Sequence, residues 1–213
     1  YELIYENRAG HEKKYEIVSH HEISDISELG AKVSGVSIVA LYQGKILLLR
    51  EFRMGVDRFI YNLCAGMKEE GETMEDCIRR ELYEETGLSL KKIHHILNPA
   101  FAAVSICDIL NQVAFVEAEG EIDDSHMSEN EWIQAAFYTK EEVAQLLRTE
   151  QFSSRALPGF SRSGGWIICN RMSLKREAQA SFLVSIVILF HLFPVFTGAS
   201  YRVLYMGVVR DEK

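Results

Sequence analysis

The pattern of apolar positions first indicates a β-hairpin in the middle of the chain. Runs rich in β-branched residues and leucine cover residues 32–42 and 45–52, with Gln43 and Gly44 between them. A two-residue turn that ends in glycine is typical of a tight hairpin, because glycine tolerates a positive φ. Shorter apolar and aromatic runs predict further strands at residues 59–64, 93–97, 112–117 and 133–138.

Two segments have the spacing of amphipathic helices. In residues 74–86 the apolar positions recur every three or four residues, between Thr73 as an N-cap and Gly87 as a left-handed terminator. A second helix is expected over residues 140–148, where Thr139 opens a capping box. Strands interleaved with two helices predict an α/β fold, in which a mixed β-sheet is sandwiched between helices.

Charge and composition divide the chain near residue 155. Residues 156–213 hold seven basic and three acidic side chains, whereas residues 1–155 hold 16 and 28, which gives net charges of +4 and −12. Residues 1–155 are predicted to be one domain, and residues 156–213 an appended tail. The tail contains an uncharged stretch of 24 residues, 178–201, which is long enough to cross a bilayer. The alternative is that the tail is the product of a frameshift or a fusion.

The composition of the whole chain excludes several classes of protein. Of its 213 residues 47% are hydrophobic and 25% are charged, which excludes disorder, collagen and coiled coil. The net charge of −8 argues against nucleic acid as a partner. Four cysteines without metal-ligand spacing, and an N-terminus too charged for a signal peptide, indicate a cytoplasmic location. Membrane attachment is expected only through residues 178–201.

The segment with the clearest chemistry is a glycine loop that leads into an acidic helix. Residues 66–88 read Gly-Met-Lys-Glu-Glu-Gly-Glu-Thr-Met-Glu-Asp-Cys-Ile-Arg-Arg-Glu-Leu-Tyr-Glu-Glu-Thr-Gly-Leu. Glu81, Glu84 and Glu85 are spaced so that they crowd one side of the helix, where like charges repel. A hard divalent cation such as Mg²⁺ would offset that repulsion. The alternative is that the three glutamates form a solvated helix face.

This segment resembles the Nudix box, G-x5-E-x7-R-E-U-x-E-E-x-G-U with U aliphatic. All nine fixed positions are matched, by Gly66, Glu72, Arg80, Glu81, Leu82, Glu84, Glu85, Gly87 and Leu88. The resemblance implies a Nudix-type fold and Mg²⁺ or Mn²⁺ held by the Gly66 carbonyl with Glu81, Glu84 and Glu85. Arg80 is expected to point away from these carboxylates and to pair with Glu72, and Gly87 to end the helix.

A second acidic segment supplies candidates for the general base. Residues 117–131 contain seven acidic side chains and no lysine or arginine. In ADP-ribose pyrophosphatase-like members of the family a loop here carries a Glu-x-Glu pair, which Glu129 and Glu131 match. One would be the base, with Glu129 preferred, and the other a further metal ligand, while Glu84 is a third catalytic candidate. An ordinary acidic surface loop is the alternative.

Two short motifs are similar to those of ADP-ribose pyrophosphatases. Arg50 to Arg53 resemble Glu-Gln-Phe-Arg, with Glu51 in place of Gln, and both arginines are predicted to bind substrate phosphate. A salt bridge at the sheet edge is the alternative for Arg53. Asn62-Leu-Cys-Ala-Gly66 is close to Glu-Leu-Pro-Ala-Gly, with Asn62 in place of Glu and Cys in place of Pro.

The predicted substrate is therefore a nucleoside diphosphate sugar, with ADP-ribose cleaved to AMP and ribose 5-phosphate by activated water. The alternatives are another nucleotide substrate and a binding or regulatory module. The resemblance also implies a homodimer. Residues 1–30 are expected to form a small antiparallel sheet from strands 3–5 and 15–18. These strands are too short and polar to be stable alone, so a second subunit would cover their edges.

Overall fold

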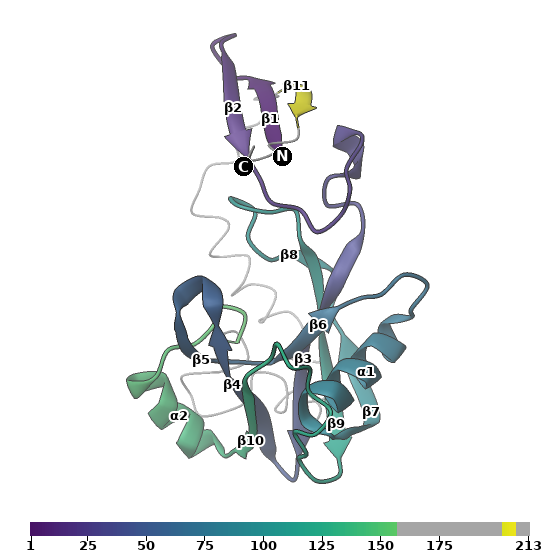
Figure 1. The fold of residues 1–213 in the computed structure, drawn as a ribbon, viewed down its shortest axis with the longest axis vertical. Coiled ribbons are helices and arrows are strands. Elements are labelled where there is room, and N and C mark those ends of the chain that lie inside the picture. The colour runs from purple at the N-terminus through teal and green to yellow at the C-terminus, as the bar shows by residue number, and fades with distance from the viewer. Residues whose placement is uncertain (157–201, 208–213) are drawn as a thin grey trace, which may run out of the picture.

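The computed structural model describes residues 1–156 and 202–207, in which a mixed β-sheet carries one helix on each face. A small sheet lies apart from this body, beyond the loop that carries β8 (Figure 1). This arrangement confirms the predicted α/β sandwich. The elements are β1 (Glu2–Glu6), β2 (Glu12–Glu16), β3 (Val33–Tyr42), β4 (Lys45–Arg53), β5 (Arg58–Asn62), β6 (Cys64–Met67), α1 (Met74–Thr86), β7 (Ser89–Ile96), β8 (Ala100–Phe101), β9 (Leu110–Glu119), β10 (Ile133–Tyr138), α2 (Lys140–Thr149) and β11 (Arg202–Gly207).

The main sheet opens between β3 and β4, which pair with each other at one end only. We call this opening the fork. Its order is β10-β4-β3-β9-β7, with β3 and β9 parallel. β3 and β4 pair with each other only beside their turn, at Leu41↔Ile46 and Tyr42↔Lys45. Beyond that point β5 pairs with β4 and β6 pairs with β3, so the chain between them bridges the opening. The fork brings the start of the acidic motif next to β4.

Both faces of the main sheet are buried, which explains the continuous apolar runs of its central strands. Along β4, Leu47 and Leu49 pack in the cluster under α1, whereas Ile46 and Leu48 pack in the cluster that includes Val143 of α2. Successive side chains of a strand point to opposite faces, so the part of β4 that is covered on both sides, residues 46–49, has no polar positions.

The local signals in the sequence correspond closely to the observed elements. Gln43 and Gly44 have φ of 49° and 79°, as a turn with two left-handed central residues requires. The Thr73 side chain accepts a hydrogen bond from the Asp76 backbone, and Gly87, with φ of 72°, ends α1. The predicted capping box is also present at the start of α2.

The small sheet has three strands in the order β11-β1-β2. β11 pairs antiparallel with β1, so the chain itself covers that edge of β1. The sequence analysis did not predict β11, which lies in the segment treated as an appended tail. The division at residue 155 and the second subunit both stay predictions. β2, whose five residues are all exposed, is the outer strand of this sheet among the described residues.

The apolar stretch 178–201 lies outside the described residues. In the part of the chain that the structure describes, no helix is long and apolar enough to span a membrane.

Candidate active site

The candidate active site is centred on two carboxylates on the inner face of α1. Glu81 and Glu85 are only 9% and 6% exposed, and they share this face with the fully buried Ile78 and Leu82. Residues four apart lie one above the other on a helix, so the spacing that buries the apolar side chains also buries these two charges. Glu84 does not join them, because its side chain is about half exposed. The predicted crowding of three carboxylates is therefore a buried pair with a third at the rim.

Gly66 on β6 leaves the space that the Glu81 carboxylate occupies. A Cβ atom at Gly66 would overlap that carboxyl group, so a residue with a side chain cannot occupy this position without displacing Glu81. Gly35 on β3 has a similar role, because its Cβ would overlap the Gly66 carbonyl oxygen. The sequence analysis identified Gly66 and missed Gly35, whose only signal is a glycine within an otherwise apolar strand.

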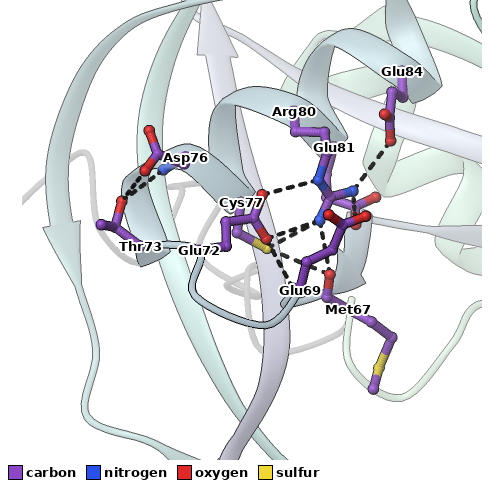
Figure 2. A network of polar contacts seen from close by, with 9 residues as sticks. All are labelled: Met67, Glu69, Glu72, Thr73, Asp76, Cys77, Arg80, Glu81 and Glu84. Carbon is purple, nitrogen blue, oxygen red and sulfur yellow. Dashed lines mark hydrogen bonds and ion pairs between the residues drawn. The ribbon is translucent and has the colours of Figure 1, made fainter.

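Arg80 joins the glycine loop to the helix (Figure 2). Its Nε donates to Glu72 at 2.9 Å, and its Nη2 donates to Glu72 at 3.1 Å and to the Met67 carbonyl at 2.8 Å. The hydrogen bonds from Arg80 hold the pKa of Glu72 at about 2. The expectation that Arg80 points away from the other carboxylates is wrong, since its Nη1 donates to Glu81 at 2.7 Å and to Glu84 at 3.1 Å. A planar guanidinium with five N–H groups can serve all these acceptors at once.

Glu85 has weaker compensation than Glu81. The Ala65 backbone N–H donates to its Oε2 at 3.1 Å, and the Cys64 thiol also donates to it. Burial raises the pKa of Glu85 to about 8, and it also raises the pKa of Cys64, which therefore stays a neutral donor. Burial raises the pKa of Glu81 too, although Arg80 opposes that change. Desolvation thus outweighs the favourable contacts at both carboxylates.

The donor set fits a hard divalent cation in its chemistry. Glu81, Glu85 and the Gly66 carbonyl all offer oxygen, and Mg²⁺ takes carboxylates together with substrate phosphate. The Glu81 carboxylate occupies the space that a side chain at position 66 would need, so it lies directly against the Gly66 backbone. Among the described residues, no three His, Cys, Asp or Glu side chains are gathered closely enough to hold a metal ion. The structure therefore shows the donors, and the metal stays a prediction.

The acidic loop brings one of its two candidate bases near the pair. Glu131 is exposed and accepts a hydrogen bond from the Ser128 backbone at 3.1 Å. Burial is the main cause of the raised pKa of Glu81, and the negative charge of Glu131 adds to it. Glu129 is also exposed. The effect of Glu131 on Glu81 favours Glu131, and which of the two is the general base stays a prediction.

The two predicted arginines lie on opposite faces of the main sheet. Arg53 is beside Glu51, with 3.4 Å between Nη1 and Oε2, on the face that carries α1. Arg50 places its guanidinium 4.2 Å from the centre of the Phe59 ring and donates to Gln134 at 3.2 Å. Residues an odd number of positions apart on a strand point to opposite faces of the sheet. Of the two arginines, only Arg53 therefore lies on the same face as the carboxylates.

A buried polar pair was missed in the sequence. Asn62 donates from Nδ2 to Glu51 Oε1 at 2.7 Å, and both side chains are almost fully buried. At both positions the chain departs from the motifs it resembles. Glu51 is a carboxylate in place of the amide of Gln, and Asn62 is an amide in place of the carboxylate of Glu. The two departures together keep one carboxylate and one amide. The signal was present, but only strand pairing shows that the two positions meet.

Comparison with known proteins gives a consistent picture. A family model described as NUDIX domain matches residues 31–160. The ADP-ribose pyrophosphatase of Bacillus subtilis is 31% identical over 114 residues, which cover 51% of this chain and 59% of that protein. The ADP-ribose pyrophosphatase of Saccharomyces cerevisiae is 26% identical over 142 residues, 62% of this chain and 59% of that protein.

Two further similarities are more limited. The NAD-capped RNA hydrolase NudC of Vibrio parahaemolyticus is 33% identical over 73 residues, 34% of this chain and 28% of that protein. This chain therefore matches less than two thirds of the length of each of these relatives. A crystal structure of ADP compounds hydrolase aligns with a TM-score of 0.54 at 17% identity, over 89% of this chain and 85% of the other, which shows a shared fold.

The contact between Gly66 and Glu81 predicts a large effect of one methyl group. Gly66→Ala should lower the free energy of unfolding by about 1–3 kcal/mol, because the carboxylate must move. Gly55→Ala is the matched control, since a Cβ there meets no atom within 4 Å. Urea unfolding of both variants measures the difference. Equal stability of the two variants would contradict the observed packing.

The raised pKa of Glu85 predicts a pH-dependent gain from removing its charge. Between the ordinary pKa of 4.5 and the folded value of about 8, only the unfolded chain loses the proton, so this group destabilises the fold increasingly as pH rises. In EDTA, Glu85→Gln should therefore stabilise the protein by roughly 2 kcal/mol at pH 8.5 and by less than half of that at pH 5.5. Thermal unfolding at both pH values tests this, and a pH-independent effect would refute it.

Proposed function

The chain belongs to the NUDIX family of hydrolases, and we propose that it cleaves the pyrophosphate linkage of a nucleoside diphosphate sugar. The first candidate substrate is ADP-ribose, which would give AMP and ribose 5-phosphate. The observation that carries the proposal is the buried pair Glu81 and Glu85. Glu81 lies against Gly66, and Arg53, at the end of β4, is on the same face of the sheet as the pair. Buried like charges are costly to keep, and their retention on a core-facing helix surface is typical of a catalytic centre.

The protein contributes a prearranged set of oxygen donors. Members of the family generally use a divalent metal, and Glu81, Glu85 and the Gly66 carbonyl would hold it here. When bound, a divalent ion lowers the pKa of water and neutralises negative charge on phosphate. Arg80 keeps Glu81 in its orientation, and the Ala65 N–H does the same for Glu85. Glu72 holds Arg80 in turn, so the glycine loop and the helix position the donors together.

We assign the general base to Glu131 rather than to Glu129. Proton abstraction from water requires a carboxylate within hydrogen-bonding reach, directly or through one water. Glu131 precedes β10, which pairs with β4, and its charge acts on Glu81. Its side chain is exposed, so water can reach it.

The substrate class is supported by the arginine on the α1 face and by the relatives. Arg53 is half exposed and can bind a phosphate while its Nη1 stays near Glu51. Two of the similar proteins are ADP-ribose pyrophosphatases. Arg50 stacks on Phe59 and does not face the carboxylates. We therefore give it only an indirect role, through the sheet that it shares with Arg53. A cytoplasmic homodimer, in which the outer edge of β2 is covered, completes the proposal.

The proposal predicts metal-dependent turnover that requires Glu81. The protein should hydrolyse ADP-ribose with Mg²⁺ or Mn²⁺, lose activity in EDTA, and lose at least 100-fold in kcat on Glu81→Gln. Glu75→Gln is the matched control on the exposed side of α1 and should stay within two-fold. A coupled assay across nucleoside diphosphate sugars, NADH, dinucleoside polyphosphates and nucleoside triphosphates identifies the substrate. A strong preference for triphosphates would overturn the substrate class.

The assignment of the base predicts a contrast between two neighbouring glutamates. Glu131→Gln should lower kcat by about 100-fold or more, because loss of a general base typically costs that much, with little change in the metal concentration needed. Glu129→Gln should stay within a few-fold of the unaltered protein. Steady-state kinetics at saturating Mg²⁺ measure both. The opposite contrast would return the role to Glu129.

A further inference from the structure

A cleft of about 800 Å³ opens beside the fork, outside the buried carboxylate pair. Its walls come from three loops: the turn Met54–Val56 after β4, the connection between β8 and β9, and the segment that follows α2. Asn130 also lines it, so the acidic loop that carries Glu131 reaches its rim. The cleft is connected to the candidate active site through Asn62, which lines it and donates to Glu51. Its polar residues are Arg53, Asn62, Asn130, Ser153, Ser154 and Arg155.

The segment after α2 is held firmly against the sheet. The Tyr61 N–H donates to the Gln151 carbonyl at 2.8 Å, and the Ser153 N–H donates to the Tyr61 carbonyl at 2.9 Å. The Phe152 ring stacks on Tyr61 with centroids 5.3 Å apart, and Ala156 is fully buried. Arg155 thus leaves the backbone from a fixed position, which a binding residue needs.

Arg155 has a charge that the surrounding residues do not neutralise. No hydrogen bond or ion pair joins its guanidinium to any other residue that the structure describes. Arg53 lines the same cleft, and Glu51, whose negative charge acts on Arg155, is already bonded by Asn62 and Arg53. Burial and, after it, the positive charge of Arg53 lower the pKa of Arg155, although an arginine stays charged. Two guanidinium groups around one carboxylate leave positive charge for an anion.

Asn62 lines the same cleft and has a hydrogen-bond acceptor without a donor among the described residues. Its Nδ2 is used by Glu51, but its Oδ1 is buried and has no partner among the described residues. The residue is only 4% exposed and lines the cleft. A buried acceptor without a donor is unfavourable, so a ligand hydroxyl that donates to it would be favoured. The cleft therefore offers cations for a phosphate and an acceptor for a hydroxyl.

We propose that this cleft binds the phosphosugar half of the substrate, with Arg155 and Arg53 holding the phosphate from two sides and Asn62 Oδ1 accepting a hydrogen bond from a sugar hydroxyl. The inference rests on the proposed function and extends it, because it names Arg155 and Asn62 as the residues that recognise a sugar phosphate. Arg155 is a binding residue in this scheme, and the chemistry at Glu81 and Glu85 does not use it.

Ribose 5-phosphate is the probe, titrated calorimetrically into the full chain. Arg155→Gln should raise its Kd at least ten-fold, Arg155→Lys should give an intermediate value, and Arg148→Gln, on the exposed end of α2, should leave it unchanged. Inorganic phosphate should bind at least five-fold more weakly than ribose 5-phosphate. Equal binding of the two ligands would overturn the assignment of Asn62. A wild-type Kd for Arg155→Gln, with an unchanged unfolding midpoint, would overturn that of Arg155.

Turnover separates this inference from the proposed function. With ADP-ribose, Arg155→Gln should raise KM about ten-fold and change kcat less than five-fold, and Arg155→Lys should restore part of the KM. If ADP-ribose is hydrolysed while Arg155→Gln keeps the wild-type KM and Kd, the inference fails and the function stands. If ribose 5-phosphate binding requires Arg155 but no nucleoside diphosphate sugar is hydrolysed, the function fails and the cleft assignment stands.

Discussion

The burial of two carboxyl groups on one face of a helix is the constraint on which the rest of the site depends. A carboxylate taken from water loses several kcal/mol of solvation unless other groups replace the water. Arg80 replaces it at Glu81, while the Ala65 amide and the Cys64 thiol replace part of it at Glu85. These groups reach the helix because β6 is inserted beside β3, which Gly35 permits, and the Glu81 carboxylate lies against β6 because position 66 is a glycine.

Features with local causes could be predicted from the sequence. The bounds of α1 follow from Thr73 and Gly87, and the β3–β4 turn follows from Gln43 and Gly44, because caps and tight turns depend on a few adjacent residues. β6 and β11 were missed, since each exists through pairing with a strand distant in the sequence. Strands of four and six residues are too short to show a periodicity that distinguishes them from a loop.

The same distinction applies to the site. The motif glutamates lie on one helix, so their spacing alone indicates which of them share a face, yet it does not reveal that this face is buried. Strand alternation could have separated Arg50 from Arg53, but not shown which of them faces α1. Arg155 carries no local signal, and the departure at Asn62 does not reveal its place in the cleft, because both positions depend on the pairing of β5 with β4 and with the segment after α2.

The pair formed by Glu51 and Asn62 has an evolutionary consequence. Restoring Glu at position 62 alone would place two carboxylates in contact without water, and restoring Gln at position 51 alone would leave two amides and remove the partner of Arg53. Each reversion is unfavourable in the background of the other, so the two positions are epistatic and are expected to change together. A comparison that scores each position separately counts two substitutions, although they alter a single interaction.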